Sequence, residues 1–184
     1  MPDVLVIGDG PGGLSAALFL AKNKLEVVVL GEDKTAMHWA LLKNYLGVPE
    51  MLGSDFQKVA REQVTAVGAT LRAAHVDAVA RDGEKFKVTL AGGESLSAKY
   101  LILSEGKAPQ LSKQLGLQFD EGNGIATDRN ARSSLEGVYV VGRSARPGRS
   151  QAIISAGDGA AAAIDILSRE HGKSFIDWDE PPKA

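Results

Sequence analysis

The stretch Asp3-Val4-Leu5-Val6-Ile7-Gly8-Asp9-Gly10-Pro11-Gly12-Gly13 decides the fold of this chain. Its apolar half predicts a short buried strand, and that strand runs directly into a Gly-x-Gly-x-x-Gly turn. An alanine-rich helical pattern follows, and Val27–Leu30 then predicts a second apolar strand. A strand, a glycine turn, a helix and a second strand in this order are typical of a unit that binds a dinucleotide pyrophosphate.

Each glycine of the turn is expected to have its own task. Gly8 allows the chain to turn sharply, Gly10 lets a phosphate approach the backbone, and Gly13 lets the helix pack against the sheet. The free N–H groups and the positive dipole end of the helix then face the phosphates. A purely structural glycine turn is the alternative, and it is disfavoured because the flanking strands and the helix are all present.

An acidic residue is expected at the end of the second strand, about 20 residues beyond the glycines, where it would bind a ribose hydroxyl. Gly31 occupies that position, and Glu32 and Asp33 are the first acids after it. Either acid could reach the ribose if the loop bends inward. The alternative is that both are solvated loop charges.

Composition narrows the classes of protein to which the chain can belong. It has 184 residues, of which 44% are hydrophobic, so one domain with a sizeable core is expected. A formal net charge of −2 argues against a nucleic-acid binder. The absence of cysteine excludes disulfides, thiolate nucleophiles and cysteine-ligated metals in these residues. With no apolar run long enough to span a membrane and no signal peptide evident, we expect a cytoplasmic protein that does not interact with membranes.

The middle of the chain predicts one helix and an irregular segment before it. Ser54 predicts the N-cap of a helix over residues 55–67, with Val59 and Val64 on its apolar side. Trp39 lies in the irregular segment, and we expect it to pack in the core, with the shaping of a substrate pocket as the alternative.

The second half predicts further strands and a long helix. Asp82-Gly83 predicts a hairpin in an antiparallel insertion over about residues 75–97. The fold class expected is α/β, a Rossmann-like doubly wound parallel sheet with a small antiparallel β insertion. We expect one FAD/NAD(P)-binding domain over residues 1–184. The remaining predicted elements are buried strands at 99–103 and 137–142, a helix at 152–169 and a tail at about 172–184.

A second glycine site follows the strand over residues 137–142. The strand ends in Gly142, a loop crosses, and a helix begins near Ala152 over small residues. Backbone N–H groups would converge on a ligand there for the second time. A mononucleotide would not need both places, whereas FAD would use the first helix for its pyrophosphate and the second for its flavin ring.

On these motifs the chain resembles the FAD domain of the thioredoxin-reductase-like flavoproteins, in the pyridine nucleotide-disulfide oxidoreductase family. The matching pieces lie in family order and extend over nearly the whole chain. They are Val6-Ile7-Gly8-x-Gly10-Pro11-x-Gly13, Asn44-Tyr45-x-Gly47, Leu101-Ile102-Leu103-x-x-Gly106, Gln151-Ala152-Ile153 and Ala156-Gly157-Asp158-Gly159.

The resemblance implies a set of FAD contacts. The glycine loop would hold the pyrophosphate, the backbone near Val76 would meet the adenine, and Gly106 would lie by the flavin half. Asn44 and the start of the last helix would lie against the flavin ring, where the helix dipole favours negative charge. The cofactor-binding residues expected are Gly8, Gly10, Pro11, Gly12, Gly13, Gly31, Glu32, Asn44, Val76, Gly106, Gly142, Arg143, Gln151, Ala152 and Ile153.

The chain departs from the family pattern in three ways. Only residues 107–137 separate Gly106 from the late strand, and they contain no second glycine fingerprint for an NADPH domain. The redox-active Cys-x-x-Cys is absent. The Gly-Asp that follows the late strand in the family is Gly142-Arg143 here, so this acid and the one expected at Gly31 are both missing.

Arginines near the late strand support two interpretations. Arg143 could reach a phosphate, because a guanidinium binds phosphate through two parallel hydrogen bonds. The loop around it is either a solvated basic segment or a dock for an anion or partner beside the flavin. The other arginines of this group are Arg129, Arg132, Arg146 and Arg149.

The sequence gives little support for metal binding, for acid–base catalysis by paired carboxylates or for a nucleophilic serine. His38, His75 and His171 have no metal-site spacing, and paired carboxylates or a nucleophile elbow are not evident. No catalytic residue is therefore assigned, and no metal is expected.

The leading hypothesis is a small FAD-dependent oxidoreductase that is not a functional thioredoxin reductase. Its electrons would come from transiently bound NAD(P)H or from a protein donor and pass to an unknown acceptor without dithiol chemistry. The alternative is a non-catalytic nucleotide- or FAD-binding module, or a subunit of a larger complex. An NAD(P)-dependent dehydrogenase is the weaker third hypothesis, since no separate substrate domain is evident. A homodimer that uses the tail around Trp178 is also considered.

Overall fold

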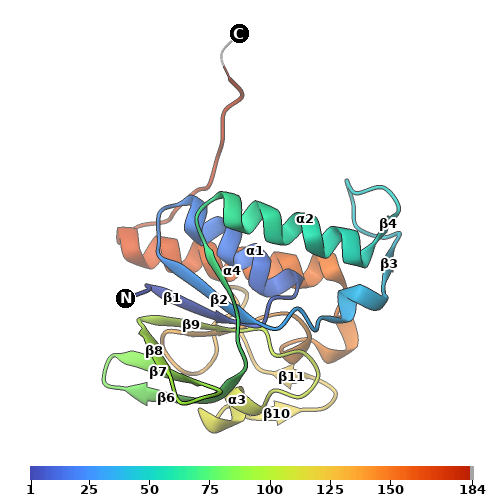
Figure 1. The fold of residues 1–184 in the computed structure, drawn as a ribbon. Helices are drawn as coiled ribbons and strands as arrows, with labels where there is room; N and C mark the ends of the chain where they lie inside the picture. The colour runs from blue at the N-terminus through green and yellow to red at the C-terminus, as the bar shows by residue number, and fades with distance from the viewer. Residues whose placement is uncertain (183–184) are drawn as a thin grey trace.

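A five-stranded parallel sheet forms the centre of the protein in a computed structural model that describes residues 1–182 (Figure 1). The strand order is β12-β9-β1-β2-β5, and Val4 of β1 lies between Val27 of β2 and Tyr100 of β9. This arrangement confirms the predicted Rossmann-like α/β class. The bounds are β1 Val4–Ile7, β2 Val27–Gly31, β5 Thr70–Ala73, β9 Tyr100–Leu103 and β12 Val138–Val140.

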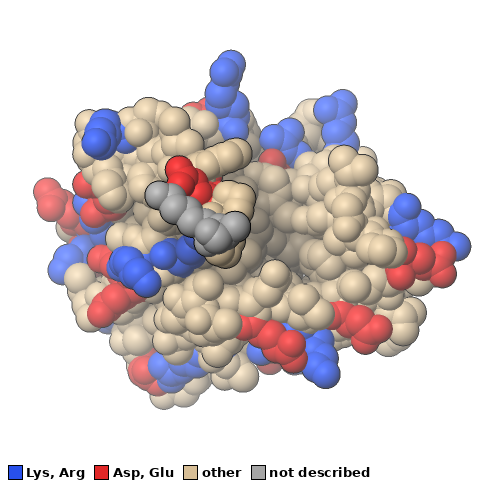
Figure 2. Space-filling view, turned by 90° about the horizontal axis from the view of Figure 1, so that it is seen from above, with Lys and Arg blue, Asp and Glu red and all other residues tan. Residues whose placement is uncertain are grey.

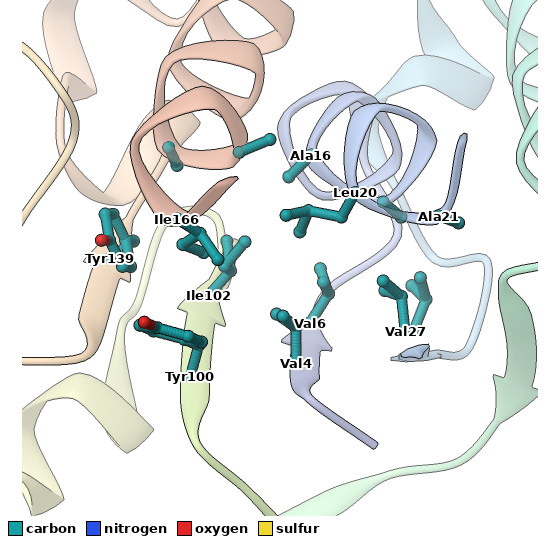
Figure 3. Packing of buried hydrophobic residues seen from close by; sticks show 14 of the residues in the cluster. Val4, Val6, Ala16, Leu20, Ala21, Val27, Tyr100, Ile102, Tyr139 and Ile166 are labelled. Atoms are coloured by element: carbon teal, nitrogen blue, oxygen red, sulfur yellow. The ribbon is translucent and has the colours of Figure 1, made fainter. Parts of the chain in front are cut away.

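Three helices cover one face of the sheet: α1 (Pro11–Lys22), α2 (Gly53–Ala66) and α4 (Ala152–His171). Strand residues that point to this face pack against the small and branched side chains of the helices, as Figure 3 shows for Val6, Leu20 and Ile166. Side chains on both faces of β1 are buried, as expected for a parallel sheet covered on both sides.

The opposite face is covered by the predicted antiparallel layer, which has three strands: β6 (Val76–Asp82), β7 (Lys85–Leu90) and β8 (Ser95–Ala98). Leu5 and Ile7 of β1 pack against this layer, since side chains alternate along a strand. The short elements are η1 Ala36–Trp39, β3 Leu41–Leu42, β4 Met51–Leu52, α3 Gln110–Gln114, β10 Phe119–Asp120, β11 Gly124–Ile125, η2 Gly142–Ser144 and η3 Pro147–Arg149.

Helices α1 and α4 approach so closely that only glycine fits at their contact. A Cβ at Gly159 would lie 2.0 Å from the Gly12 carbonyl oxygen and 3.0 Å from the Ala16 nitrogen. On the same helix, a Cβ at Gly157 would have no atom within 4 Å. The two glycines therefore form a matched pair for measuring what this contact contributes to stability.

Gly159→Ala is expected to lower the free energy of unfolding by about 1–3 kcal/mol, because the added methyl forces the helices apart. Gly157→Ala should raise it by about 0.8–1 kcal/mol, since alanine is the better helix former and meets no clash. Urea unfolding followed by circular dichroism measures both. Equal effects of the two substitutions would show that the helices move apart at no cost.

Three local expectations are wrong. Helix α2 begins at Gly53, with Leu52 as its N-cap and no side-chain cap, because the Gly53 N–H donates to the Ala40 carbonyl at 2.8 Å and starts the helix early. Ser54 is therefore not the cap. Val59 is 46% exposed, since the helix packs through Gln57 and Val64 instead. Trp39 is 92% exposed rather than in the core, because it ends η1 at the surface.

The surface carries no block of one charge on the face seen in Figure 2, where acidic and basic groups are interspersed around the rim. Within residues 1–182, no helix has both the length and the apolar character needed to cross a bilayer. The predicted tail leaves α4 at Gly172, and Asp177 in it accepts from Lys22 at 2.9 Å. Residues 183 and 184 of this tail lie outside the described part of the chain.

Candidate cofactor site

The sheet reverses its order at β1, with β2 and β5 on one side and β9 and β12 on the other. In open α/β sheets, ligands bind at the carboxyl ends of the strands at such a switch point. A cleft of about 700 Å³ lies there, a volume within the range of cofactor sites. It is lined at the ends of four strands, by Ile7 and Gly8, by Leu30 and Gly31, by Ser104 and Glu105, and by Gly142 and Arg143.

The glycine loop at the end of β1 has the geometry that its spacing predicts. Gly8 has a φ of +101°, and a Cβ there would lie 2.2 Å from the Ser104 carbonyl oxygen. A Cβ at Gly13 would lie 2.0 Å from the Gly8 carbonyl oxygen, so this residue sets the close packing of α1 on the turn. A Cβ at Gly10 would meet only Thr35 Oγ1, at 3.5 Å, and would otherwise project into open space. The loop is thus close-packed on its inner side and accessible on its outer side.

The far end of the cleft lies where α4 begins. Ala152 and Ser155 of α4 line it together with Gly106. Gly106 has a φ of +84° and no atom within 4 Å of its would-be Cβ, and its carbonyl accepts from Ser144 Oγ at 3.1 Å. The N-termini of two long helices, α1 and α4, therefore border one cleft, and each favours negative charge on a ligand.

The structure brings most of the predicted cofactor residues to this cleft. Those that line it are Gly8, Gly10, Pro11, Gly12, Gly31, Glu32, Val76, Gly106, Gly142, Arg143 and Ala152. Gly13 is buried behind the loop. Asn44, Gln151 and Ile153 are not among the lining residues, although Asn44 Nδ2 donates to Gln151 Oε1 at 2.9 Å. That bond places the Asn44 segment beside the start of α4.

The charged side chains at the cleft differ in the partners that they have within residues 1–182. Glu32 accepts from Lys34 at 2.9 Å and pairs with His75 at 3.0 Å, and these two hydrogen bonds lower the pKa of Glu32. Glu105 accepts from the Leu111 N–H at 2.7 Å and so caps α3. Arg143 lines the cleft and has no ion pair with any residue that the structure describes.

Asp9 is a residue of the cleft that the sequence analysis does not predict. It lies between the first two glycines of the loop, is 5% exposed and lines the cleft. Its Oδ2 accepts from Arg61 at 2.5 Å and from the Asp33 N–H at 3.0 Å. The sequence does carry a signal for Asp9. It is an acid inside the glycine loop, together with a glycine at position 31, where an acid is expected.

Ion pairs with acids of α4 separate the arginines that the sequence analysis grouped together. Arg146 donates to both oxygens of Asp158, at 3.0 and 3.1 Å, so its side chain is already engaged by α4. Burial raises the pKa of Asp158 despite that pairing. Arg132 is engaged by Asp165, also on α4. These pairs leave Arg143 as the member of the group that lines the cleft.

No group of three potential metal ligands occurs within residues 1–182. His38 instead lies 2.8 Å from the Asp33 carbonyl oxygen, and His171 lies 2.8 Å from the Leu167 carbonyl oxygen. All three histidines therefore have local partners, since His75 pairs with Glu32.

Comparisons with known proteins agree with the geometry. The sequence pattern of the pyridine nucleotide-disulphide oxidoreductase family matches residues 2–53 and 40–159. The bifunctional thioredoxin reductase/thioredoxin of Mycobacterium leprae is 30% identical over 91% of this chain and 35% of its own. The thioredoxin reductase of Mycolicibacterium smegmatis is 34% identical over 68% of this chain and 41% of its own. The chain thus spans well under half the length of these two relatives.

Solved structures show the same fold. A thioredoxin reductase from Gloeobacter violaceus has a TM-score of 0.87 at 18% identity, with 97% of this chain and 99% of that one covered. A ferredoxin-flavin thioredoxin reductase from Clostridium acetobutylicum has a TM-score of 0.80 at 16% identity, with 94% and 99% covered.

Proposed function

Because the chain belongs to the pyridine nucleotide-disulphide oxidoreductase family, we propose that it is a thioredoxin-reductase-like flavoprotein that binds FAD and transfers electrons. Residues 1–184 would form a single FAD-binding domain. The observation that carries this proposal is the one cleft bordered by the N-termini of both α1 and α4. A ligand that reaches both ends must be long, and it must be anionic where it meets α1.

The residues present fit such a cofactor. The open outer side of Gly10 admits a pyrophosphate, and the free space at Gly106 admits a group beside the α4 end. The Gly8–Gly13 loop would hold the pyrophosphate, Gly31 and Glu32 would face the ribose, and Val76 the adenine. Near the flavin half would lie Gly106, Gly142, Arg143, Asn44, Gln151, Ala152 and Ile153. FAD supplies the electron-carrying group, which no side chain in these 184 residues can supply.

The electron donor is proposed to be transient NAD(P)H or a donor protein. Residues 107–137 hold the short helix α3 and the two-stranded β10–β11 sheet, and no second glycine fingerprint interrupts them. Reducing equivalents would therefore come from outside this part of the chain. The fold shared with a ferredoxin-flavin reductase supports including a ferredoxin in the test.

Purified full-length protein is expected to bind FAD and to be yellow after reconstitution. FMN should bind more weakly than FAD, because it lacks the AMP half and with it one phosphate of the pyrophosphate that the glycine loop would hold. Anaerobic titration with NADPH, NADH and reduced ferredoxin should bleach the flavin with at least one donor. Failure of all three donors with bound FAD would leave a cofactor-binding protein without this electron transfer.

A second candidate function is a non-catalytic nucleotide-binding module or a subunit of a larger complex. Arg143 favours it, since this arginine has no ion pair within residues 1–182 and lines the cleft at the place where the family carries an acid. A protein that stays colourless with FAD but binds ADP would support this candidate over the flavoprotein.

A further inference from the structure

Asp9 fills the space into which a side chain at the end of β2 would project. A Cβ at Gly31 would lie 2.4 Å from Asp9 Cγ and 2.7 Å from both Asp9 Cβ and Oδ1. No residue larger than glycine fits at position 31 while Asp9 keeps this conformation. The carboxylate of Asp9 thus stands at the strand end where nucleotide-binding folds of this type place an acid for the ribose.

The two oxygens of the Asp9 carboxylate have different environments. Oδ2 is occupied, by Arg61 at 2.5 Å and the Asp33 N–H at 3.0 Å. Oδ1 accepts no hydrogen bond from any residue in the range 1–182, and the side chain lines the cleft although only 6% of it is exposed. Oδ1 is not fully buried, because the one fully buried side-chain N or O atom without a partner in residues 1–182 is Gln57 Oε1. Oδ1 is therefore open to a donor from the cleft that Asp9 lines.

Two side chains of α2 hold Asp9 in place through hydrogen bonds. Gln57 Nε2 donates to the Asp9 carbonyl at 2.5 Å, and Arg61 donates to its carboxylate. Residues four apart lie on the same side of a helix, so one face of α2 supplies both contacts. The charge of Arg61 also offsets a carboxylate that would otherwise repel a pyrophosphate at the same loop.

We infer that Asp9 Oδ1 accepts the hydrogen bond from the adenosine ribose hydroxyl, with Gln57 and Arg61 as positioning residues. The Asp9–Gly31 pair is then a relocated form of the strand-end acid. Glu32, the sequence-based candidate, lies one residue further and is already bound by Lys34 and His75. This inference rests on the proposed function only in that both require a nucleotide in the same cleft.

Isothermal titration of the full chain with ADP and 2′-deoxy-ADP tests it. Wild-type protein should bind 2′-deoxy-ADP about ten- to a hundredfold more weakly, since a hydrogen bond to a charged group is lost. In Asp9→Ala the two ligands should bind equally. In the control variant Asp77→Asn, which also loses one carboxylate that lines the cleft, the wild-type ratio of the two affinities should remain.

A second set of variants keeps the test decisive if Asp9→Ala does not fold. Gly31→Glu should bind ADP poorly because its Cβ collides with Asp9, and Asp9→Gly/Gly31→Glu should regain both binding and discrimination. An affinity ratio that persists in Asp9→Ala, or that vanishes in Asp77→Asn, overturns the inference but leaves FAD binding intact. Binding of ADP without binding of FAD overturns the flavoprotein and leaves Asp9 testable by the same ratio. Binding of neither ligand overturns both.

Discussion

The Gly13→Ala variant is expected to lose most of its folding stability together with its capacity to bind FAD. The new methyl would lie 2.0 Å from the Gly8 carbonyl oxygen and 3.1 Å from Val6 Cγ1. Backbone hydrogen bonds on both sides hold this turn, from the Gly8 N–H to Leu30 at 2.8 Å and from the Leu14 N–H to Gly10 at 3.0 Å. Because the turn cannot open without losing them, we expect a loss of about 3 kcal/mol or more in the free energy of unfolding.

Gly10→Ala is the matched control, and it should separate folding from binding. Gly10 has a φ of −75° and a ψ of −179°, which any residue adopts, and its would-be Cβ has 3.5 Å to its nearest neighbour. The variant should therefore unfold at the urea concentration of the wild type. Its methyl would occupy the approach to the loop, so ADP and FAD should bind about tenfold more weakly or worse.

Urea unfolding and isothermal titration distinguish the two glycine variants. Wild-type affinity in a folded Gly10→Ala protein would show that no phosphate contacts this loop, and the FAD proposal would lose its pyrophosphate site. Wild-type stability in Gly13→Ala would show that α1 shifts away from the turn without cost.

The sequence predicts well those features that are determined by local pattern. The β1-α1-β2 unit, the buried strands β9 and β12 and the long α4 all follow from apolar runs, helical periodicity and glycine positions. The tasks of Gly8 and Gly13 follow as well, because a tight turn and a close approach restrict the residue type itself.

Features that depend on distant segments could not be predicted. Trp39 carries no local signal that distinguishes an exposed loop aromatic from a core residue. The engagement of Arg146 by Asp158 and of Asp9 by Arg61 depends on how α4 and α2 lie over the loops. The candidate site is therefore predictable where the backbone forms it and not where packed side chains complete it.

The buried network around Asp165 should give the second large effect, away from the cleft. Asp165 Oδ2 accepts from Tyr139 and from Arg132, both at 2.6 Å, and so joins α4 to β12. The Asp165 side chain is 6% exposed, and Tyr139 is 1% exposed (Figure 3 shows Tyr139 beneath α4). Asp165→Ala leaves the tyrosine hydroxyl buried without its partner, and we expect a loss of about 3 kcal/mol in the free energy of unfolding.

Two comparisons show whether this loss arises from the network. Tyr139→Phe removes one hydrogen bond and leaves Asp165 paired with Arg132, so it should cost about 1 kcal/mol. Asp77→Asn, at an exposed carboxylate, should change stability by less than about 0.5 kcal/mol. Neither Asp165 nor Tyr139 lines the cleft, so ADP affinity should be unchanged in the folded protein. Equal stability of Asp165→Ala and wild type would show that the network contributes nothing.

Acid unfolding gives an independent check on Asp165. Burial alone would raise its pKa, but the hydrogen bonds from Arg132 and Tyr139 outweigh burial, so the pKa of Asp165 lies below its usual value. A carboxyl group with a lowered folded-state pKa stabilises the protein fully above its unfolded-state pKa of about 4, and that contribution is lost as the pH falls through the folded-state pKa. The difference in stability between wild type and Asp165→Asn should therefore be constant near neutral pH and shrink below about pH 4. Urea unfolding between neutral and acidic pH measures this difference, and a gap that widens on acidification would contradict the assignment of a charged, hydrogen-bonded Asp165.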